Sequence, residues 1–219
     1  MQTNWNLAGL ILEGICGSGK TTILRSILQS DRYRDRPFLS AVVLSEHHTQ
    51  RVLERQENEA GLTPEDSVRL LDGHVSHLES LNERLARMDW LERNRTGMRV
   101  PYVFERFHFT HACHYPHVRW DHVEPIDRRL AALNCRVCVL TVPEERIHER
   151  IIAGRDAGWR DYLRRHGSSE DEIVDHYRMQ QERLLELRRM SVLPVVVIDT
   201  TRSTADEAAE RAIDFWGIL

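Results

Sequence analysis

A glycine-rich segment that ends in a lysine and two threonines is the clearest chemical signal in the chain. Residues 14–22 read Gly-Ile-Cys-Gly-Ser-Gly-Lys-Thr-Thr, which fits the spacing G-x-x-x-x-G-K-S/T. Glycines at these places let backbone N–H groups turn inward around phosphate oxygens, and a following helix N-terminus adds partial positive charge. Lys20 can then reach the β- and γ-phosphates, and Thr21 can ligate Mg²⁺. The segment therefore predicts a P-loop with ATP and Mg²⁺ as cofactors. The residues predicted to bind the nucleotide are Gly14, Cys16, Gly17, Ser18, Gly19, Lys20, Thr21 and Thr22.

The composition singles out the same lysine. Of the 30 basic residues 29 are arginine, and Lys20 is the only lysine in the chain. A compact ammonium and a planar guanidinium are not interchangeable in a tight phosphate pocket. This supports Lys20 as a catalytic residue that binds phosphate. The absence of a second lysine also excludes the guanine-specific Asn-Lys-x-Asp motif.

Two glutamates that follow predicted strands are candidates for the chemistry around the phosphates. Glu105 ends an apolar run that starts at residue 100, and Glu46 comes shortly after the run over residues 38–44. Because α/β proteins place ligand-binding groups at the carboxyl ends of their strands, both are expected near the P-loop. Glu105 is predicted to hold Mg²⁺ or its water shell, or to orient the acceptor. Arg106 beside it is predicted to contact phosphate or an acceptor oxygen.

Glu46 is predicted to act as the general base for an acceptor hydroxyl, because phosphoryl transfer needs an oriented nucleophile that can lose its proton. Each glutamate has a plainer alternative. Glu105 and Arg106 can form a solvated ion pair at a strand end, and Glu46 can be an exposed loop carboxylate.

An arginine-rich stretch predicts a mobile lid over residues 150–167. Guanidinium groups that close over the phosphates would stabilise the charge spread over the transferring group. Arg155 and Arg160 are the predicted catalytic arginines, because Gly158 between them suits a hinge. Arg164 and Arg165 are interpreted as part of a solvated helical face.

Five short apolar runs alternate with helical patterns along the chain. The runs predict strands over residues 7–13, 38–44, 100–105, 136–142 and 194–199. Helices are predicted over residues 20–29, 63–93, 143–154 and 205–216, and from Ser168 onward. The alternation predicts a single domain over residues 1–219 of the α/β class. We expect a three-layer P-loop NTPase fold, with a mostly parallel five-stranded sheet and helices on both faces.

Histidines recur at every third residue from His108 to His117, a spacing that suggests a metal site. Pro116 interrupts the helix, however, and no carboxylate falls within the run. The histidines are therefore interpreted as acceptor contacts at a helix start or as surface residues.

Cys135 and Cys138 have the C-x-x-C spacing, but within a strand this spacing points them to opposite faces, so they are predicted to lie in the core.

Composition narrows the choice of partners. No run of about 18 apolar residues is present, which predicts that the chain does not enter a membrane. Four cysteines without a disulfide framework fit a reducing environment, so the predicted location is cytoplasmic. The formal net charge of −4 gives no reason to expect a nucleic-acid partner. The predicted partner is a small-molecule phosphate acceptor.

The whole chain resembles the thymidylate kinase and deoxynucleoside kinase group. The run from Leu12 to Thr22 is similar to the phosphate loop of that group, including the acidic residue before the first glycine. Ser45-Glu46-His47 lies where the group has an acidic residue followed by proline, and Glu105-Arg106 resembles its Glu-Arg-Ser or Asp-Arg-Tyr signature. Residues 71–77, 150–160 and 195–200 resemble the acceptor-pocket helix, the lid and the last strand. The resemblance implies that Glu46 is the base and that a homodimer forms through the helix predicted over residues 63–93.

The departures from the group's pattern all concern the acceptor side. Proline is missing after Glu46, and neither serine nor tyrosine follows Arg106. These differences favour a relative with an unusual acceptor over a thymidylate kinase of the usual kind.

Two functions of different classes remain as hypotheses. The first is an ATP- and Mg²⁺-dependent phosphotransferase, a kinase that moves the γ-phosphate to a small nucleoside, nucleotide or related hydroxylated acceptor. If that acceptor were already a phosphate, no base would be needed, and Arg51 or Arg106 would be expected to bind it. The alternative is a nucleotide-dependent regulatory ATPase or switch that acts on a protein partner, although no switch motif is recognisable. A degenerate kinase without turnover is a weaker third hypothesis, because Lys20 and Thr21 are intact.

Overall fold

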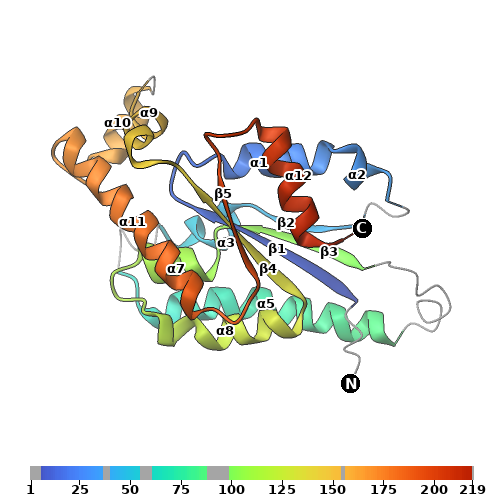
Figure 1. Cartoon of the computed structure of the whole chain (residues 1–219). Helices are drawn as coiled ribbons and strands as arrows, with labels where there is room; N and C mark the ends of the chain where they lie inside the picture. Colours follow the sequence, from blue (N-terminus) through green and yellow to red (C-terminus); the bar gives the residue numbers. More distant parts are fainter. Residues whose placement is uncertain (1–5, 37–39, 55–60, 88–98, 154–155, 219) are drawn as a thin grey trace.

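A parallel β-sheet of five strands forms the centre of the molecule (Figure 1). The computed structural model describes residues 6–36, 40–54, 61–87, 99–153 and 156–218. Within these residues the strand order is β2-β3-β1-β4-β5, and every neighbouring pair is parallel. The strands are β1 (Leu7–Gly14), β2 (Val42–Leu44), β3 (Val100–Glu105), β4 (Cys135–Thr141) and β5 (Val195–Asp199).

Helices cover both faces of this sheet (Figure 1). One face is covered by α1 (Lys20–Gln29), α2 (Asp31–Arg34) and α12 (Ala205–Trp216). The other face is covered by α5 (Pro64–Ala86), α7 (His108–His114), α8 (Trp120–Ala132) and α11 (Glu170–Met190). The predicted three-layer α/β architecture is confirmed, and the described strands are wholly parallel.

Each face of the sheet has its own apolar core. A parallel strand that is covered on both sides must be apolar on both, and all eight residues of β1 are accordingly buried. Cys135 and Cys138 of β4 belong to the cores on opposite faces, as their spacing predicted, and both are free thiols.

Short elements gather at the carboxyl edge of the sheet. After β2 come α3 (Glu46–Thr49) and η1 (Arg51–Leu53), and after β4 come η2 (Glu144–Arg146) and α9 (Ile147–Ile151). The next helix in the chain is α10 (Ala157–Leu163), which lies beside α9 (Figure 1). Because α1 and α7 also begin where β1 and β3 end, every parallel strand delivers its following segment to this edge.

Several predicted boundaries agree with the structure and others need correction. The helices over residues 20–29 and 205–216 and the strand over 100–105 have the predicted bounds. The start of α5 is capped, because Thr63 and Asp66 form a capping box around Pro64. The helix predicted over residues 143–154 is instead the 3₁₀ turn η2 followed by the short α9. Part of the strand predicted over 38–44 and the end of the helix predicted to residue 93 lie outside the described residues.

Candidate active site

The phosphate loop connects β1 to α1 through glycines with left-handed backbone angles. The φ values are 149° at Gly14, 73° at Gly17 and 88° at Gly19, a range that residues with a Cβ rarely adopt. A Cβ on Gly17 would also lie 2.7 Å from the carbonyl oxygen of Arg150. The glycines therefore permit both the turn and the close approach of the segment at α9, and α1 starts directly after the loop.

Lys20 is buried inside this loop. Its side-chain ammonium donates to the carbonyl oxygens of Gly14 at 3.0 Å and Ile15 at 2.8 Å, and only 5% of the residue is exposed. Burial, and then the positive charge of Arg106, lower the pKa of Lys20 to about 8. The group is therefore charged at neutral pH but poorly solvated, so a phosphate oxygen would be a stronger partner than the two carbonyls.

The hydroxyl groups of the loop differ in their surroundings. The Ser18 hydroxyl is buried and has no hydrogen-bond partner among the described residues, whereas Thr21 and Thr22 are exposed in the first turn of α1. Cys16 is half-buried and faces a cavity beside the loop. The eight residues predicted to bind the nucleotide are thus brought into one loop and helix start, and their individual roles remain predictions.

Glu105 lies beside the loop at the end of β3. It pairs in register with Leu12 of β1, and only 1% of the residue is exposed. Its Oε1 atom is buried without a hydrogen-bond partner in the described part of the chain. A buried carboxylate oxygen without a partner is costly to the fold, and such an oxygen is a preferred ligand for Mg²⁺. The predicted pair of metal ligands, Thr21 and Glu105, therefore fits a magnesium ion in its donor chemistry.

Arg106 occupies a strained backbone conformation directly after Glu105. Its φ is 54°, which is uncommon for a residue with a side chain. The surrounding contacts hold this corner in place: the Arg106 N–H donates to the Leu12 carbonyl at 2.9 Å. The Phe107 N–H donates to Glu13 at 2.9 Å, and the Thr49 hydroxyl donates to the Glu105 carbonyl. Strain of this kind persists only where neighbours over-determine the geometry, and it concentrates at functional sites.

Glu46 forms the other side of the site, at the first position of α3. Its carboxylate lies 2.8 Å from Nε of Arg106 and 3.8 Å from a terminal nitrogen of Arg51, and 25% of its side chain is exposed. Burial alone would raise the pKa of Glu46, but the charges of Arg106, Lys20 and Arg51 hold it below its usual range. Glu46 is therefore an ionised and paired carboxylate, and the alternative of a solvated loop residue is wrong.

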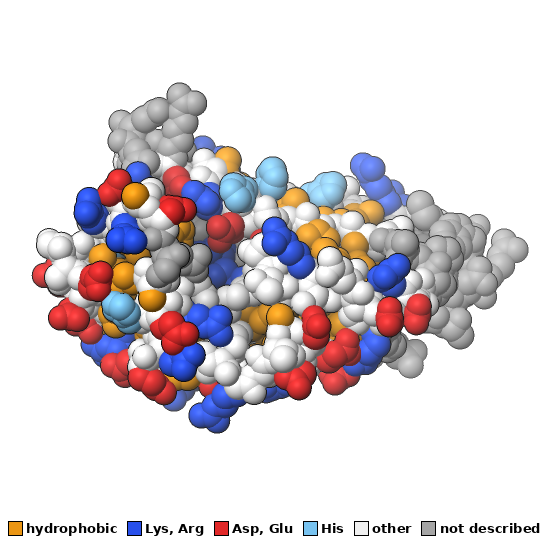
Figure 2. Space-filling view, turned by 90° about the horizontal axis from the view of Figure 1, so that it is seen from above, with side chains coloured by type: hydrophobic (Ala, Val, Ile, Leu, Met, Phe, Trp, Pro, Cys, Tyr) orange, Lys and Arg blue, Asp and Glu red, His pale blue; other side chains and the backbone are white. Residues whose placement is uncertain are grey.

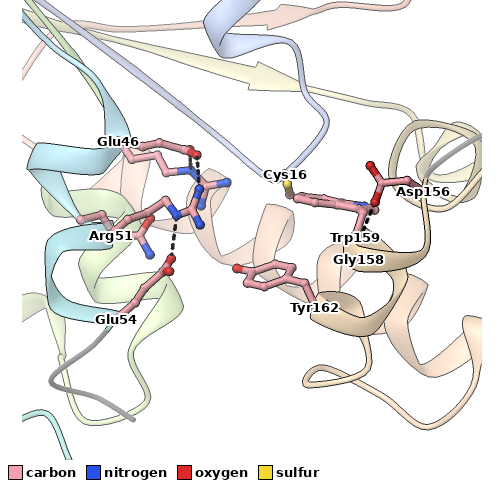
Figure 3. Close-up of a pocket in the computed structure, with 10 residues that line it drawn as sticks. Cys16, Glu46, Arg51, Glu54, Asp156, Gly158, Trp159 and Tyr162 are labelled. Atoms are coloured by element: carbon pink, nitrogen blue, oxygen red, sulfur yellow. Dashed lines mark hydrogen bonds and ion pairs between the residues drawn. The ribbon is translucent and has the colours of Figure 1, made fainter. Parts of the chain in front are cut away.

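A cavity of about 270 Å³ opens between these groups and α10 (Figure 3). On one side lie residues of α3 and η1 with Arg106, and on the other side lie residues of α10, while Cys16 of the phosphate loop closes one end. The lining residues are Cys16, Glu46, Gln50, Arg51, Glu54, Arg106, Asp156, Gly158, Trp159 and Tyr162.

The segment predicted to be a lid turns other side chains toward the cavity than the sequence predicts. Arg160 does not line this cavity, because it lies on the opposite side of α10, in a second hollow with Ile152 and Leu163. Gly158 is no loop hinge but part of the first turn of α10. Arg155 lies outside the described residues. The described helix therefore turns Trp159 and Tyr162 toward the cavity. Only the arginines of this segment are predicted from sequence to face the phosphates, and these two residues are not identified, although their spacing of three places them on one face of a helix.

The histidine run is structural at its first two positions. His108 is buried 2.9 Å from Asp127, and His111 is buried with its Nε2 2.8 Å from the Thr49 carbonyl. They are therefore neither surface residues nor acceptor contacts, which corrects the interpretation from sequence. The described residues hold no cluster of three or more His, Cys, Asp or Glu side chains that could bind a metal.

The outer surface mixes charges of both signs. On the face seen in Figure 2, acidic and basic side chains alternate, and hydrophobic side chains occur in small groups. The expectation of no nucleic-acid partner and the suggested homodimer remain predictions. No helix among the described residues is both long and apolar enough to cross a membrane.

Comparison with known proteins shows which solved structures share this fold. The sequence matches no protein-family model and no curated protein. The YorR protein from Bacillus subtilis, solved in complex with phosphorylated GDP, is similar over 94% of both chains, with 15% identity and a TM-score of 0.55. Shikimate kinase from Acinetobacter baumannii in complex with shikimate has 17% identity and a TM-score of 0.51, over 95% of this chain and 92% of that one. Thymidylate kinase from Ehrlichia chaffeensis has 12% identity and a TM-score of 0.50, over 95% and 97%.

At these identities the likeness shows the fold alone. The chain has the three-layer α/β fold of the P-loop kinases, as predicted, and the phosphate loop stands where that fold requires it, between the first strand and first helix. The same fold serves many phosphate acceptors, so the substrates that these structures are named for are statements about those proteins only.

Proposed function

We propose that this protein is an ATP- and Mg²⁺-dependent phosphotransferase that moves the γ-phosphate to a small nucleoside, nucleotide or related hydroxylated acceptor. One observation carries the proposal. The Arg106–Glu46 ion pair, 2.8 Å long, lies between the buried Lys20 of the phosphate loop and a cavity of small-molecule size. A hydrolytic switch needs the loop and a positioned water, whereas a phosphate acceptor also requires a cavity that adjoins the loop, as this one does.

The roles of the residues follow from their positions. The loop amides and Lys20 bind the triphosphate, and Lys20 exchanges its carbonyl partners for phosphate oxygens. Glu46 accepts the hydrogen bond, and then the proton, of an acceptor hydroxyl. The acceptor oxygen bonds to the γ-phosphorus while the bond to the β,γ-bridging oxygen breaks, and ADP leaves with that electron pair. Arg106 stabilises the charge on the transferring group.

Magnesium fits the residues present. Thr21 and the buried Oε1 of Glu105 would hold the ion, either directly or through its water shell. The metal would neutralise charge on the phosphates and orient them.

ATP consumption tests the proposal directly. ADP release is measured with nucleosides, nucleoside monophosphates and hydroxylated antibiotics as acceptors, for the wild type, Lys20→Ala and Arg25→Ala. The last variant removes an exposed charge from the same helix and serves as the matched control. We expect acceptor-dependent ADP release in the wild type and control, and a loss of at least about a hundredfold in Lys20→Ala.

The outcome against the proposal is equally clear. If ADP appears at the same slow rate with every compound and without any compound, the protein is not a small-molecule kinase. The regulatory ATPase that acts on a protein partner would then be the better hypothesis.

A further inference from the structure

The side of α10 that faces the active site is aromatic. Trp159 and Tyr162 reach from α10 toward η1 and α3 across the cavity (Figure 3). Their rings are stacked, with centroids 5.3 Å apart and planes inclined by 29°. The Trp159 indole N–H donates to the Ile151 carbonyl at 2.8 Å, and its backbone N–H donates to Asp156 at 2.8 Å. Because both ends of the residue are fixed, α10 presents a preformed flat wall to whatever occupies the cavity.

The opposite wall is polar, and its cations are already paired. Arg106 is 2.8 Å from Glu46, and Arg51 is 3.0 Å from Glu54 and 3.8 Å from Glu46. Asp156, at the start of α10, adds a third carboxylate to the two on this wall, so the described part of the lining has three carboxylates, two guanidinium groups and a net charge of −1. A phosphate on the acceptor would have to enter this negative lining and separate existing ion pairs, whereas a hydroxyl needs only a hydrogen bond to Glu46.

Arg160, the one of the two predicted lid arginines that lies within the described residues, does not face the cavity. Arg160 lines a hollow on the other side of α10, with Leu163, Ser169 and Ile173. Because successive residues of a helix are about 100° apart, a rotation of α10 that brought Arg160 inward would turn Trp159 and Tyr162 away from the cavity and move Leu163 from its buried place. The aromatic side is therefore the one that the packing of α10 keeps toward the acceptor.

We propose that α10 is an acceptor-recognition element: Trp159 and Tyr162 bind a planar ring of an uncharged acceptor whose hydroxyl group points to Glu46. This inference rests on the proposed function and specifies its acceptor. It makes the reacting group a hydroxyl and excludes a monophosphate as the preferred acceptor. A nucleoside and a hydroxylated aryl compound share this chemistry, since both combine a flat ring with a neutral hydroxyl group. Stacking on an aromatic side chain tolerates either ring.

The test compares acceptors and variants in one steady-state assay. The acceptors are nucleosides, their 5′-monophosphates, neutral aryl alcohols, and the ring-poor acids shikimate and gluconate. The variants are Trp159→Ala, Trp159→Phe, Tyr162→Leu and Arg164→Ala. Trp159→Phe keeps a ring, and Arg164→Ala removes an exposed charge from the same helix region as the matched control. The thermal midpoint of each variant shows whether the fold is kept.

We expect the wild type to use neutral aromatic acceptors with a kcat/KM at least about a hundredfold above the matching monophosphates and ring-poor acids. Trp159→Ala and Tyr162→Leu should each raise the acceptor KM about tenfold or more and leave the KM for ATP within twofold. Trp159→Phe should stay within about threefold of the wild type, as should Arg164→Ala. A higher kcat/KM for nucleosides or for aryl alcohols shows which of these two classes of compound is the acceptor.

Two results would overturn the inference while leaving the kinase intact. One is a preference for monophosphates over the neutral compounds. The other is an acceptor KM unchanged in Trp159→Ala together with a large loss of kcat in Arg160→Ala, because α10 would then act on the phosphate. If the wild type transfers phosphate to none of the compounds, the proposed function fails, and the inference about α10, which rests on it, is overturned with it.

Discussion

Glu13 offers a sharp test of how the phosphate loop is tied to the acceptor side. This glutamate precedes Gly14 and is fully buried. Its Oε1 accepts from the backbone N–H groups of Phe107 at 2.9 Å and Thr110 at 3.3 Å, and its Oε2 accepts from the Thr110 hydroxyl. One side chain therefore joins the end of β1 to the start of α7, directly after the strained Arg106.

The substitution Glu13→Ala removes all three acceptor contacts. The Thr110 hydroxyl can rotate, but the two backbone N–H groups stay fixed and buried. Each buried donor without a partner costs roughly 1–3 kcal/mol, so we expect the free energy of unfolding to fall by about 3 kcal/mol. Glu13→Gln is the matched control. Its amide oxygen can accept from both N–H groups, and its NH₂ group can donate to the Thr110 oxygen. Only the charge is lost, which should cost about 1 kcal/mol.

Urea unfolding at 25 °C, followed by circular dichroism, measures both values. The kcat of acceptor-dependent ADP release should fall further in Glu13→Ala than in Glu13→Gln, because the corner that carries Arg106 loses its support. The reasoning would be refuted if the free energy of unfolding fell by less than about 1 kcal/mol in Glu13→Ala, or if it fell equally in the two variants. Either result would mean that the three hydrogen bonds of Glu13 do not fix this corner.

Two further predictions concern pH. Because burial and Arg106 lower the pKa of Lys20 to about 8, kcat/KM for ATP should fall with rising pH above that value, where the ammonium loses its proton. A pH profile that stays flat to about pH 10 would show that the Lys20 charge is not needed. Asp127 is buried, and although burial alone would raise its pKa, hydrogen bonds from His108 and Ser191 hold the pKa below its usual range. Its contribution to stability is therefore present above about pH 4 and is lost as the pH falls through the lower folded-state pKa. Asp127→Asn should cost about 2 kcal/mol of unfolding free energy at pH 7 and clearly less at about pH 3. An equal loss at both pH values, measured by urea unfolding, would contradict this account.

The sequence predicts the phosphate loop well because its signal is local. The glycines, Lys20 and Thr21 lie within eight residues, and the strand before them and the helix after them have simple apolar patterns. The same holds for the start of α5, where Thr63, Pro64 and Asp66 specify the cap. Such features depend on neighbours in the chain, which a pattern can record.

The cavity beside the loop is harder to predict because its contacts join distant segments. Glu46 and Arg106 are 60 positions apart, and only the parallel pairing of β2 with β3 brings the ends of these strands together. The sequence indicates only a helix start for α7 and does not predict α8, because histidines and Pro116 obscure the apolar period and Pro125 lies within α8. The burial of His108 and His111 depends on Asp127 and Thr49, partners that no spacing could indicate.

The strained corner at Arg106 explains why these distant contacts form one unit. A left-handed conformation costs about 1 kcal/mol or more for a residue with a side chain, and a glycine would avoid that cost. Arg106 occupies this position, and its guanidinium makes contacts that a glycine could not make. Its charge acts on Lys20 on one side and lies 2.8 Å from Glu46 on the other. Moving either contact would change the other, because Glu13 and Leu12 fix the backbone between them. Arg106 therefore links the phosphate loop to the neighbouring cavity, and the strand that carries the loop helps to fix its position.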